Sequence, residues 1–292
     1  MFRQLLEPIL IGMPQLGPYG LSENWLLRHL GDAHWQIICN ALDRPSRNMV
    51  DEAGNRLYAS FARVCWISTV PLSAYRESDT LSGWMEMRRY GDGIFVSTAK
   101  LFDAANGVIS ATLASIFTRR EGESNDRLLA SAPAIFDDCP IADCNTPPPF
   151  LDEHRLIRAA TTSVHNFMKF AFDTGSPVDQ VVEYRINGYQ DFNGANLLYF
   201  ASYPTIADIC ASRTQYVADH FGFERFVTDS SPIGRDIFYF GNANLGDWIS
   251  CGFKLNTAES GGLAARVDLV RKESGALIGK QFVIRERPAA VG

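Results

Sequence analysis

The sequence lacks close cysteine pairs and any His/Cys set with metal-ligand spacing. Its six cysteines stand alone, at positions 39, 65, 139, 144, 210 and 251. Secreted disulfide scaffolds are small and dense in cysteine, so a reduced, cytoplasmic protein without a structural metal is the expectation.

Long apolar runs and an excess of positive charge are also missing. No window reaches the roughly 18 apolar residues that a membrane-spanning helix needs. The apolar start MFRQLLEPILIG is interrupted by Glu7 and Pro8, and no small-residue cleavage site follows, which argues against a signal peptide. The net charge of −6 argues against a broad nucleic-acid-binding face. We therefore expect no membrane and no nucleic acid among the partners.

Recognisable catalytic strings are absent too. The chain has no Ser/His/Asp string and no phosphate-cradling Gly motif, and Gly91-Asp92-Gly93 is typical of a turn. What is present is ordinary globular composition over 292 residues, with 46% hydrophobic and 21% charged side chains. This length allows one large or two ordinary domains with a full core.

The stretch from Gly12 to Trp35, GMPQLGPYGLSENWLLRHLGDAHW, changes from a Gly/Pro-rich loop to a helical pattern. Ser22 is placed to cap the helix, with Glu23 favourable at the positive end of its dipole. The expected buried face is spaced by four, three, four and four residues: Leu26, Leu30, Ala33, Ile37 and Ala41. Free amides at a helix start can receive a carbonyl oxygen or an anion, although a capped core helix explains the same pattern.

Strand patterns follow this helix. The predicted strands cover residues 56–70, 81–89, 94–102 and 108–119, with a turn at 103–107 and an extra edge at 9–16. Asp92-Gly93 indicates a hairpin between the second and third strands.

Residues 121–154 shift toward Ser, Asp and Pro. Consecutive prolines at 147–149 stiffen an extended connection and argue against helix there, so this segment is the predicted linker. A short helix is expected within residues 155–172.

The second half repeats the order of the first. We predict a strand over 181–187, a loop over 188–194 and a helix over 195–220 interrupted at Pro204. Strands at 236–240, 247–255, 264–271 and 276–285 follow, with a turn at 256–262. Placing Asn24 on Asn196 aligns the two predicted helix starts, which suggests an internal duplication.

A long helix with an antiparallel meander, twice in one chain, indicates an α+β architecture. The pattern resembles the hot-dog fold, and two copies resemble a double hot dog, in which each sheet wraps round a central helix. The expected division is an N-terminal domain over 1–120, the linker over 121–154 and a C-terminal domain over 155–292. Enzymes of this fold typically act on acyl thioesters of coenzyme A or acyl carrier protein.

The resemblance becomes more specific in three strings: the opening block, RLYASF at 56–61 and FNGANLLYF at 192–200. Together they resemble the LnmK family of bifunctional acyltransferase/decarboxylases from polyketide biosynthesis. The resemblance implies decarboxylation of methylmalonyl-CoA and transfer of the propionyl group to the phosphopantetheine thiol of an acyl carrier protein. It implies no bound cofactor, and it places the catalytic tyrosine at Tyr58.

Decarboxylation leaves an enolate whose oxygen needs donors already in place. Candidate substrate-binding residues are those at the two predicted helix starts, with one histidine: Ser22, Glu23, Asn24, Trp25, His29, Asn193, Gly194 and Asn196. A phenol ionises near pH 10, so Tyr58 needs a base or positive charge to act as a nucleophile, or else it donates a hydrogen bond as the neutral phenol. His29 and His34 point about 140° apart on the helix, so both cannot face Tyr58.

Other assignments remain open at this stage. Tyr58 can equally be a strand aromatic that packs on the helix, and Asp191 a turn-former instead of a general acid or base. Cys65 is expected to be buried. Scattered cations, namely Arg88, Arg89, Lys100, Arg119 and Arg120, could meet coenzyme A phosphates or a carrier protein. A hot-dog thioesterase or dehydratase, a non-catalytic carrier-binding subunit and a homodimer stay possible.

Overall fold

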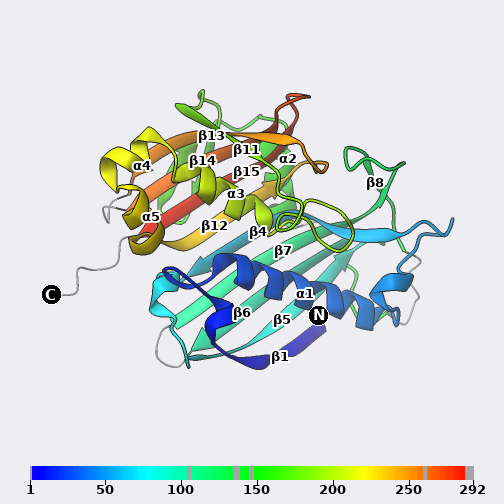
Figure 1. The fold of residues 1–292 in the computed structure, drawn as a ribbon. Helices are drawn as coiled ribbons and strands as arrows, with labels where there is room; N and C mark the ends of the chain where they lie inside the picture. Colours follow the sequence, from blue (N-terminus) through cyan, green and yellow to red (C-terminus); the bar gives the residue numbers. More distant parts are fainter. Residues whose placement is uncertain are drawn as a thin grey trace.

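One antiparallel sheet of eleven strands runs through the molecule (Figure 1). The computed structural model describes residues 2–103, 107–133, 139–144, 146, 148–258 and 262–286. Across the sheet, the order is β1 (Phe2–Leu10), β5 (Thr80–Tyr90), β6 (Ile94–Asp103), β7 (Gly107–Arg120), β4 (Leu57–Ser68), β12 (Ser231–Tyr239), β15 (Leu277–Glu286), β14 (Leu263–Arg271), β13 (Trp248–Thr257) and β11 (Gln180–Arg185), and β8 (Leu128–Ala130) pairs with β7.

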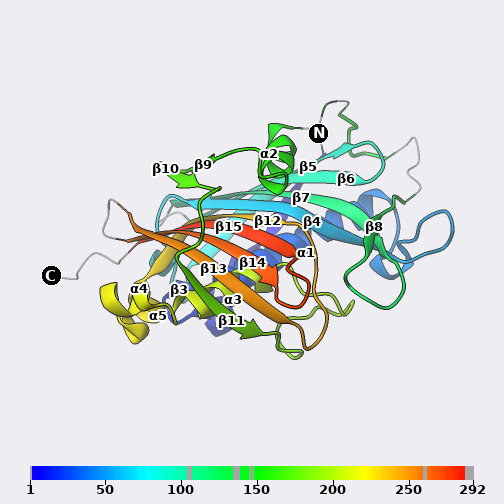
Figure 2. The same cartoon turned by 90° about the horizontal axis from the view of Figure 1, so that it is seen from above.

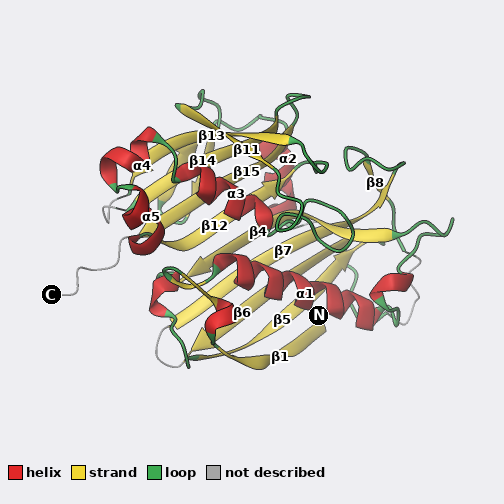
Figure 3. Cartoon of the chain, in the orientation of Figure 1, coloured by secondary structure: helices red, strands yellow, loops and turns green. Residues whose placement is uncertain are grey.

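Two helices, α1 (Glu23–Ala41) and α3 (Ser202–Ala211), cover one face of this sheet, called the inner face below (Figures 1 and 3). Helix α2 (Pro149–Arg158) and the hairpin of β9 (Val164–Phe167) and β10 (Phe170–Asp173) lie on the outer face (Figure 2). The remaining short elements are η1 (Met13–Gln15), β2 (Leu16–Gly17), β3 (Gly20–Leu21), η2 (Ser46–Asn48), η3 (Leu72–Ala74), α4 (Gln215–His220) and α5 (Phe223–Asp229). None of the described helices is long and apolar enough to span a bilayer.

Helix α1 begins where the sequence predicts. The Ser22 hydroxyl accepts a hydrogen bond from the Trp25 amide at 3.3 Å, which caps the first turn. Leu26, Leu30 and Ile37 are fully buried as expected, whereas Ala33 and Ala41 are only partly buried. The buried stripe is wider than the predicted one because the sheet curves round the helix and also covers its neighbours Leu27, His34 and Ile38.

The predicted strands of the first half are confirmed as β4 to β7, and Tyr90 pairs with Ile94 across the predicted hairpin turn. The predicted edge at 9–16 is wrong, since the edge strand is Phe2–Leu10. Its register shifts between Leu6 and Ile9, round Pro8, which has no N–H to donate. A β-strand edge accommodates such a residue.

The helix predicted over 195–220 is wrong in its start and its length. Residues 195–201 form a loop in which Asn196 has φ +56°, and α3 begins at Ser202. Pro204 lies in the first turn of α3, where backbone amides have no partner in the helix, so it does not interrupt anything. The alignment of Asn24 with Asn196 is therefore also wrong, because Asn24 lies in a helix and Asn196 precedes one by several residues.

The proline run does not prevent a helix. Helix α2 begins at Pro149, the first helical position, where the fixed φ of proline is favourable, and it ends before most of the predicted 155–172 segment. Residues 134–138, 145 and 147 of the predicted linker, 104–106 of the turn at 103–107 and 259–261 of the turn at 256–262 lie outside the described residues. The division into two domains and a linker stays a prediction.

A buried ionic network ties the two halves together on the inner face. The Arg235 guanidinium of β12 donates to both Glu23 oxygens at 2.7 and 2.9 Å and to Asp208 of α3 at 2.9 Å. Trp66 of β4 donates to Glu23 at 2.9 Å. These contacts fix the start of α1 against α3 and the centre of the sheet.

Candidate active site

The sheet opens where its two halves meet. Strands β4 and β12 pair only over residues 63–67 and 234–238. At Ala62 a bulge shifts the β4 register, and before it β4 pairs with β7 alone. The two strands therefore separate beyond the bulge, and the space between them is not closed by backbone.

A cavity of about 650 Å³ lies at this opening. Its lining comes from α1, β4, β7, β8, α2, the end of β12 and the loop at 193–200. Residues from both faces of the sheet line it, so the cavity connects the inner face with the outer face.

Aromatic side chains form the inner wall of the cavity. The rings of Phe61 and Phe200 pack 4.3 Å apart, and Phe61 lies 5.2 Å from the His34 ring. A Cβ atom at Gly31 would come within 2.4 Å of Phe200, so only glycine lets this ring reach the α1 backbone. Trp35 continues the wall along α1. This part of the cavity suits an apolar group.

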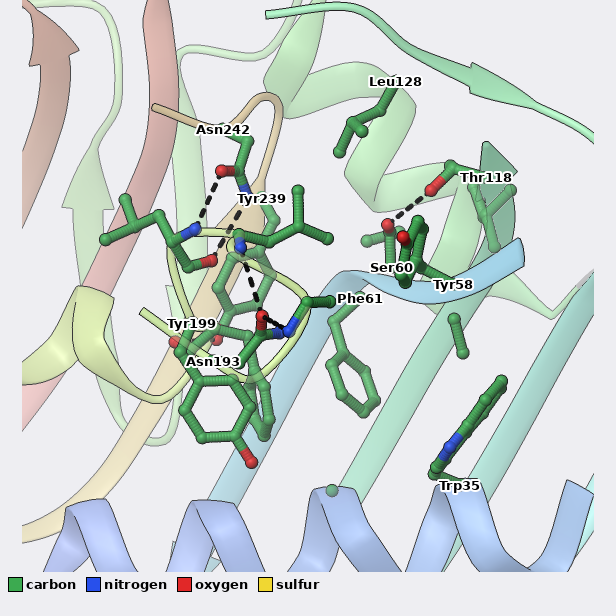
Figure 4. Close-up of a pocket in the computed structure, with 18 of the residues that line it drawn as sticks. Trp35, Tyr58, Ser60, Phe61, Thr118, Leu128, Asn193, Tyr199, Tyr239 and Asn242 are labelled. Atoms are coloured by element: carbon green, nitrogen blue, oxygen red, sulfur yellow. Dashed lines mark hydrogen bonds between the residues drawn. The ribbon is translucent and has the colours of Figure 1, made fainter. Parts of the chain in front are cut away.

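Tyr58 lies on the other side of β4. Side chains alternate along a strand, so Tyr58 and Ser60 point away from the face that carries Phe61 (Figure 4). Thr118, opposite Tyr58 on β7, shares a 2.7 Å hydroxyl contact with Ser60. Tyr58 lines the cavity but does not face α1, and its predicted catalytic role stays a prediction.

Two guanidinium groups flank the Tyr58 ring. The Cζ atoms of Arg56 and Arg120 lie 5.8 and 5.9 Å from its centroid. Arg120 also donates to the carbonyl of Ala195 at 2.8 Å, and its Nε is buried without a partner. Of the cations considered in the sequence, Arg120 is thus the one next to Tyr58.

The loop at 193–197 forms another wall. The Asn193 side-chain oxygen accepts from the amides of Ala195 and Leu197 at 3.0 and 3.1 Å, which closes a tight turn. Gly194, exposed and without a side chain, presents its backbone to the cavity. Asn242 holds the same loop by bonding the amide and the carbonyl of Leu198 (Figure 4). A turn held on both sides can present backbone donors in a fixed position.

Two buried histidines line the cavity. His34 contacts the hydroxyls of Ser97 and Ser115 at 2.7 and 2.8 Å, and burial lowers its pKa to about 3, so it is neutral. His154 of α2 donates from Nε2 to the Tyr239 carbonyl at 3.0 Å, because a carbonyl can only accept. Burial lowers the pKa of His154, and the nearby Arg158 lowers it further. Neutral His154 therefore keeps a lone pair on Nδ1.

The predicted residues at the start of α1 lie elsewhere. Ser22, Glu23, Asn24 and Trp25 do not line the cavity. Glu23 is bound by Arg235 and Trp66, and Asn24 donates to the Ala201 carbonyl at 2.8 Å. Their contacts hold α1 in place, and their predicted substrate contacts stay predictions.

His29 also lies outside the cavity lining. Its ring stacks on Trp25 with centroids 5.2 Å apart, and its buried Nε2 has no partner. Burial lowers the pKa of His29, against the opposing effect of Asp32. Of the predicted loop residues, Asn193 and Gly194 line the cavity. Asn196 is exposed to solvent, and its backbone carbonyl accepts a hydrogen bond from the Asn125 side chain.

The other sequence candidates have structural contacts. Asp191 accepts from the Tyr184 hydroxyl at 3.0 Å and the Asn187 amide at 2.7 Å, and burial raises its pKa. Burial also raises the pKa of Cys65 well above its usual value, which leaves an inert thiol. Among the described residues, no group of three or more His, Cys, Asp or Glu side chains could hold a metal ion.

No family model matches this chain, and no curated protein matches it in sequence. Several solved structures match it in fold. A protein described as an oleoyl thioesterase from Lactobacillus plantarum superposes with a TM-score of 0.67 at 10% identity, covering 100% of this chain and 98% of that one. The 12:0-ACP thioesterase from Umbellularia californica gives 0.63 at 10% identity, with 98% and 94% covered. An acyl-ACP thioesterase from Bacteroides thetaiotaomicron gives 0.56 at 12% identity, with 97% and 98% covered.

The fold is a double hot dog. This confirms the α+β prediction, with one difference: the two predicted sheets are continuous through the β4–β12 pairing. At these identities the likeness establishes the fold, and the resemblance to the LnmK family stays a prediction.

His154, Arg158 and Asn242 are cavity residues that the sequence reasoning missed. His154 is the last residue of the predicted linker, where no helix was expected, and Arg158 lies in the segment 155–172, where a short helix was expected but no site residue. Asn242 lies in a short loop after β12, and its role depends on its contact with Leu198, 44 residues earlier. The amphipathic spacing of Leu151, His154 and Ile157, the buried residues of α2, was the available signal for the helix.

Proposed function

We propose that this protein is an enzyme that breaks the acyl carbon–sulphur bond of acyl thioesters carried by coenzyme A or an acyl carrier protein. The observation that carries the proposal is the cavity between the two halves, whose lining contains both Tyr58 and the turn at Asn193 and Gly194. The double hot-dog fold, shared with solved structures of proteins described as acyl-ACP and oleoyl thioesterases, supports it.

The proposed site provides donors for a developing oxyanion. Attack on a thioester carbonyl, or loss of carbon dioxide from a malonyl-type thioester, places negative charge on the carbonyl oxygen. The Tyr58 hydroxyl, the Ser60–Thr118 hydroxyl pair and the Gly194 amide are donors in the lining. The apolar wall of Phe61 and Phe200 suits the acyl chain. The reaction needs neither a metal nor an organic cofactor.

Hydrolysis is the first candidate reaction, and the fold comparisons favour it. Water adds to the acyl carbon, the carbon–sulphur bond breaks, and the released thiolate takes a proton. Neutral His154, with Nε2–H fixed on the Tyr239 carbonyl, has a free Nδ1 lone pair that can accept the proton from water. His154 is the proposed general base for this reaction.

Decarboxylative acyl transfer is the second candidate, and the surroundings of Tyr58 favour it. Arg56 and Arg120 place positive charge on both flanks of the phenol, as an attacking or enolate-stabilising tyrosine requires. Methylmalonyl-CoA would lose carbon dioxide, and the enolate carbon would take a proton. The Tyr58 oxygen would then attack the thioester carbonyl, the carbon–sulphur bond would break, and coenzyme A would leave with the phenol proton as the free thiol. The phosphopantetheine thiol would finally take the propionyl group from the Tyr58 ester and return its proton to the phenol. The sequence resemblance supports this reaction as well.

One experiment tests the proposal and separates the two reactions. The protein is mixed with a series of acyl-CoAs including methylmalonyl-CoA, with and without a phosphopantetheinylated carrier protein. Thiol release is followed with a colorimetric assay, and the products are identified by mass spectrometry. Free acid supports hydrolysis, and a propionyl mass on the carrier supports decarboxylative transfer. Carrier or acyl-CoA binding without any cleavage would contradict the proposal and favour the non-catalytic subunit.

A further inference from the structure

The cavity has an outer end beyond the groups that the candidate reactions use. Its lining continues past Tyr58, Ser60 and the proposed base His154 to Arg158 of α2, and to Phe240 and Gly241 at the end of β12. These residues lie on the outer face or its rim. Helix α2 covers the outer face, and its His154 packs against both Phe238 and Phe240, which point to the same side because side chains alternate along the chain. A ligand whose acyl group contacts Phe61 and Phe200 can therefore extend through the opening toward α2.

Arg158 is the available cation at this outer end. It is exposed and lines the cavity, and within the described part of the chain it forms no ion pair. Arg155, one turn earlier on α2, is bound to Asp152 at 3.1 Å and does not line the cavity. Another arginine on this face, Arg63, is buried and held by Asp236 and Glu153 at 2.6 and 2.7 Å. Arg158 alone of the three can receive a ligand anion.

We propose that the thiol carrier enters the cavity from the α2 side and that Arg158 binds its 4′-phosphate, the phosphate shared by coenzyme A and carrier-bound phosphopantetheine. The inference rests on the proposed function. The pantetheine arm separates this phosphate from the thioester, so the phosphate cannot lie beside Tyr58, where Arg56 and Arg120 are found. A guanidinium at the far end of the opening is placed to bind it in a bidentate way.

The test compares thioesters of one acyl group with three thiols: N-acetylcysteamine, which has no phosphate, 4′-phosphopantetheine, which has one, and coenzyme A. Arg158→Gln is expected to raise KM roughly tenfold for both phosphate-bearing substrates, because a charge-assisted hydrogen bond is lost. KM for the N-acetylcysteamine thioester and kcat for all three, measured at alkaline pH where His154 is neutral with or without Arg158, are expected to stay unchanged. Arg158→Lys is expected to recover part of the loss. Arg155→Gln is the matched control on the same helix and is expected to change nothing.

Three results would overturn the proposal. The first is a KM that stays unchanged for both the phosphopantetheine and the coenzyme A thioester. The second is a KM that rises for the coenzyme A thioester only, which would place the adenosine phosphates, and not the 4′-phosphate, at Arg158. An equal effect on all three substrates would also overturn it, since that is what a changed fold or a changed His154 would produce. If the unmodified protein cleaves the N-acetylcysteamine thioester, the proposed function stands in each of these cases. If it cleaves none of the three, the function and the inference fail together.

Discussion

Tyr58 is the residue on which both candidate reactions depend. We expect Tyr58→Phe to lower kcat/KM for the best acyl thioester at least about a hundredfold, because a donor aimed at the developing oxyanion, or the nucleophile itself, is removed. Steady-state thiol release measures it. Tyr189→Phe, at a fully exposed tyrosine, is the control and should retain normal rates. A Tyr58→Phe protein with normal turnover would mean that the tyrosine is only a strand aromatic.

His34 makes stability depend on pH. Its pKa in the folded protein is about 3 because of burial, whereas an unfolded histidine titrates near 6.5. Its contribution is complete above about pH 6.5 and is lost as pH falls toward 3, because only the unfolded chain takes up the proton. At pH 5 this amounts to about 2 kcal/mol of unfolding free energy.

The measurement is urea unfolding at pH 7 and pH 5 for the unmodified protein and for His34→Gln. We expect the pH-dependent loss to be about 2 kcal/mol smaller in the variant. The remaining histidines are common to both proteins, so they cancel in the comparison. An identical loss in both would show that His34 is protonated or exposed in the folded state.

The contact between α1 and the loop before α3 limits the cavity. Phe200 rests on Gly31 and closes the inner wall with Phe61. We expect Phe200→Leu to move the preference toward longer acyl chains, since each additional buried methylene contributes about 0.8 kcal/mol, roughly fourfold in kcat/KM. Thioesters of increasing chain length provide the profile.

Phe226→Leu makes the matched control. Phe226 is equally buried but packs in α5 against Arg285, away from the cavity lining. It should lower stability by a similar amount without altering the chain-length profile. Equal profiles in Phe200→Leu and the unmodified protein would place the acyl chain elsewhere.

The elements that local sequence determines were predictable. The cap at Ser22, the strands β4 to β7 and the turn between Tyr90 and Ile94 follow from propensity and period alone. The start of α3 was missed because the loop at 195–201 is shaped by distant partners such as Asn242 and Arg120, which no local pattern contains. The same holds for the site: Tyr58 came from a resemblance, whereas His154 and Arg158 lie on a helix whose start at Pro149 the proline run concealed.

The whole molecule behaves as one body in this structure, because the two halves share a sheet and a buried ionic network. Arg235 is fully buried between Glu23 and Asp208. Burial alone would raise the pKa of Asp208, but the neighbouring Arg235 and Arg285 lower that pKa by more. We expect Arg235→Met to lower the unfolding free energy by about 3–5 kcal/mol, since the buried Glu23 carboxylate loses its ion-pair partner while Asp208 keeps only Arg285. Arg127→Met, at an exposed ion pair, should cost under about 1 kcal/mol.

Unfolding of the unmodified protein should be a single transition. Trp248 is the one tryptophan in the second half of the sequence, so Trp248→Phe makes fluorescence report on the first half, while circular dichroism reports on both. Coincident urea transitions by the two probes are expected. Separate transitions would mean that the halves fold independently, as the predicted linker between two domains would allow.

At the same scale, one cavity through the sheet is proposed to bind the acyl thioester, with the acyl group toward the inner face and the thiol carrier toward the outer face. A crystal structure with a non-cleavable thioether analogue of an acyl-CoA tests this most directly. We predict the acyl group against Phe61 and Phe200, the thioether sulphur between Tyr58 and Gly194, and the pantetheine arm leaving toward α2. An analogue bound anywhere else on the protein, or entering beside α1 with Tyr58 out of contact, would contradict it.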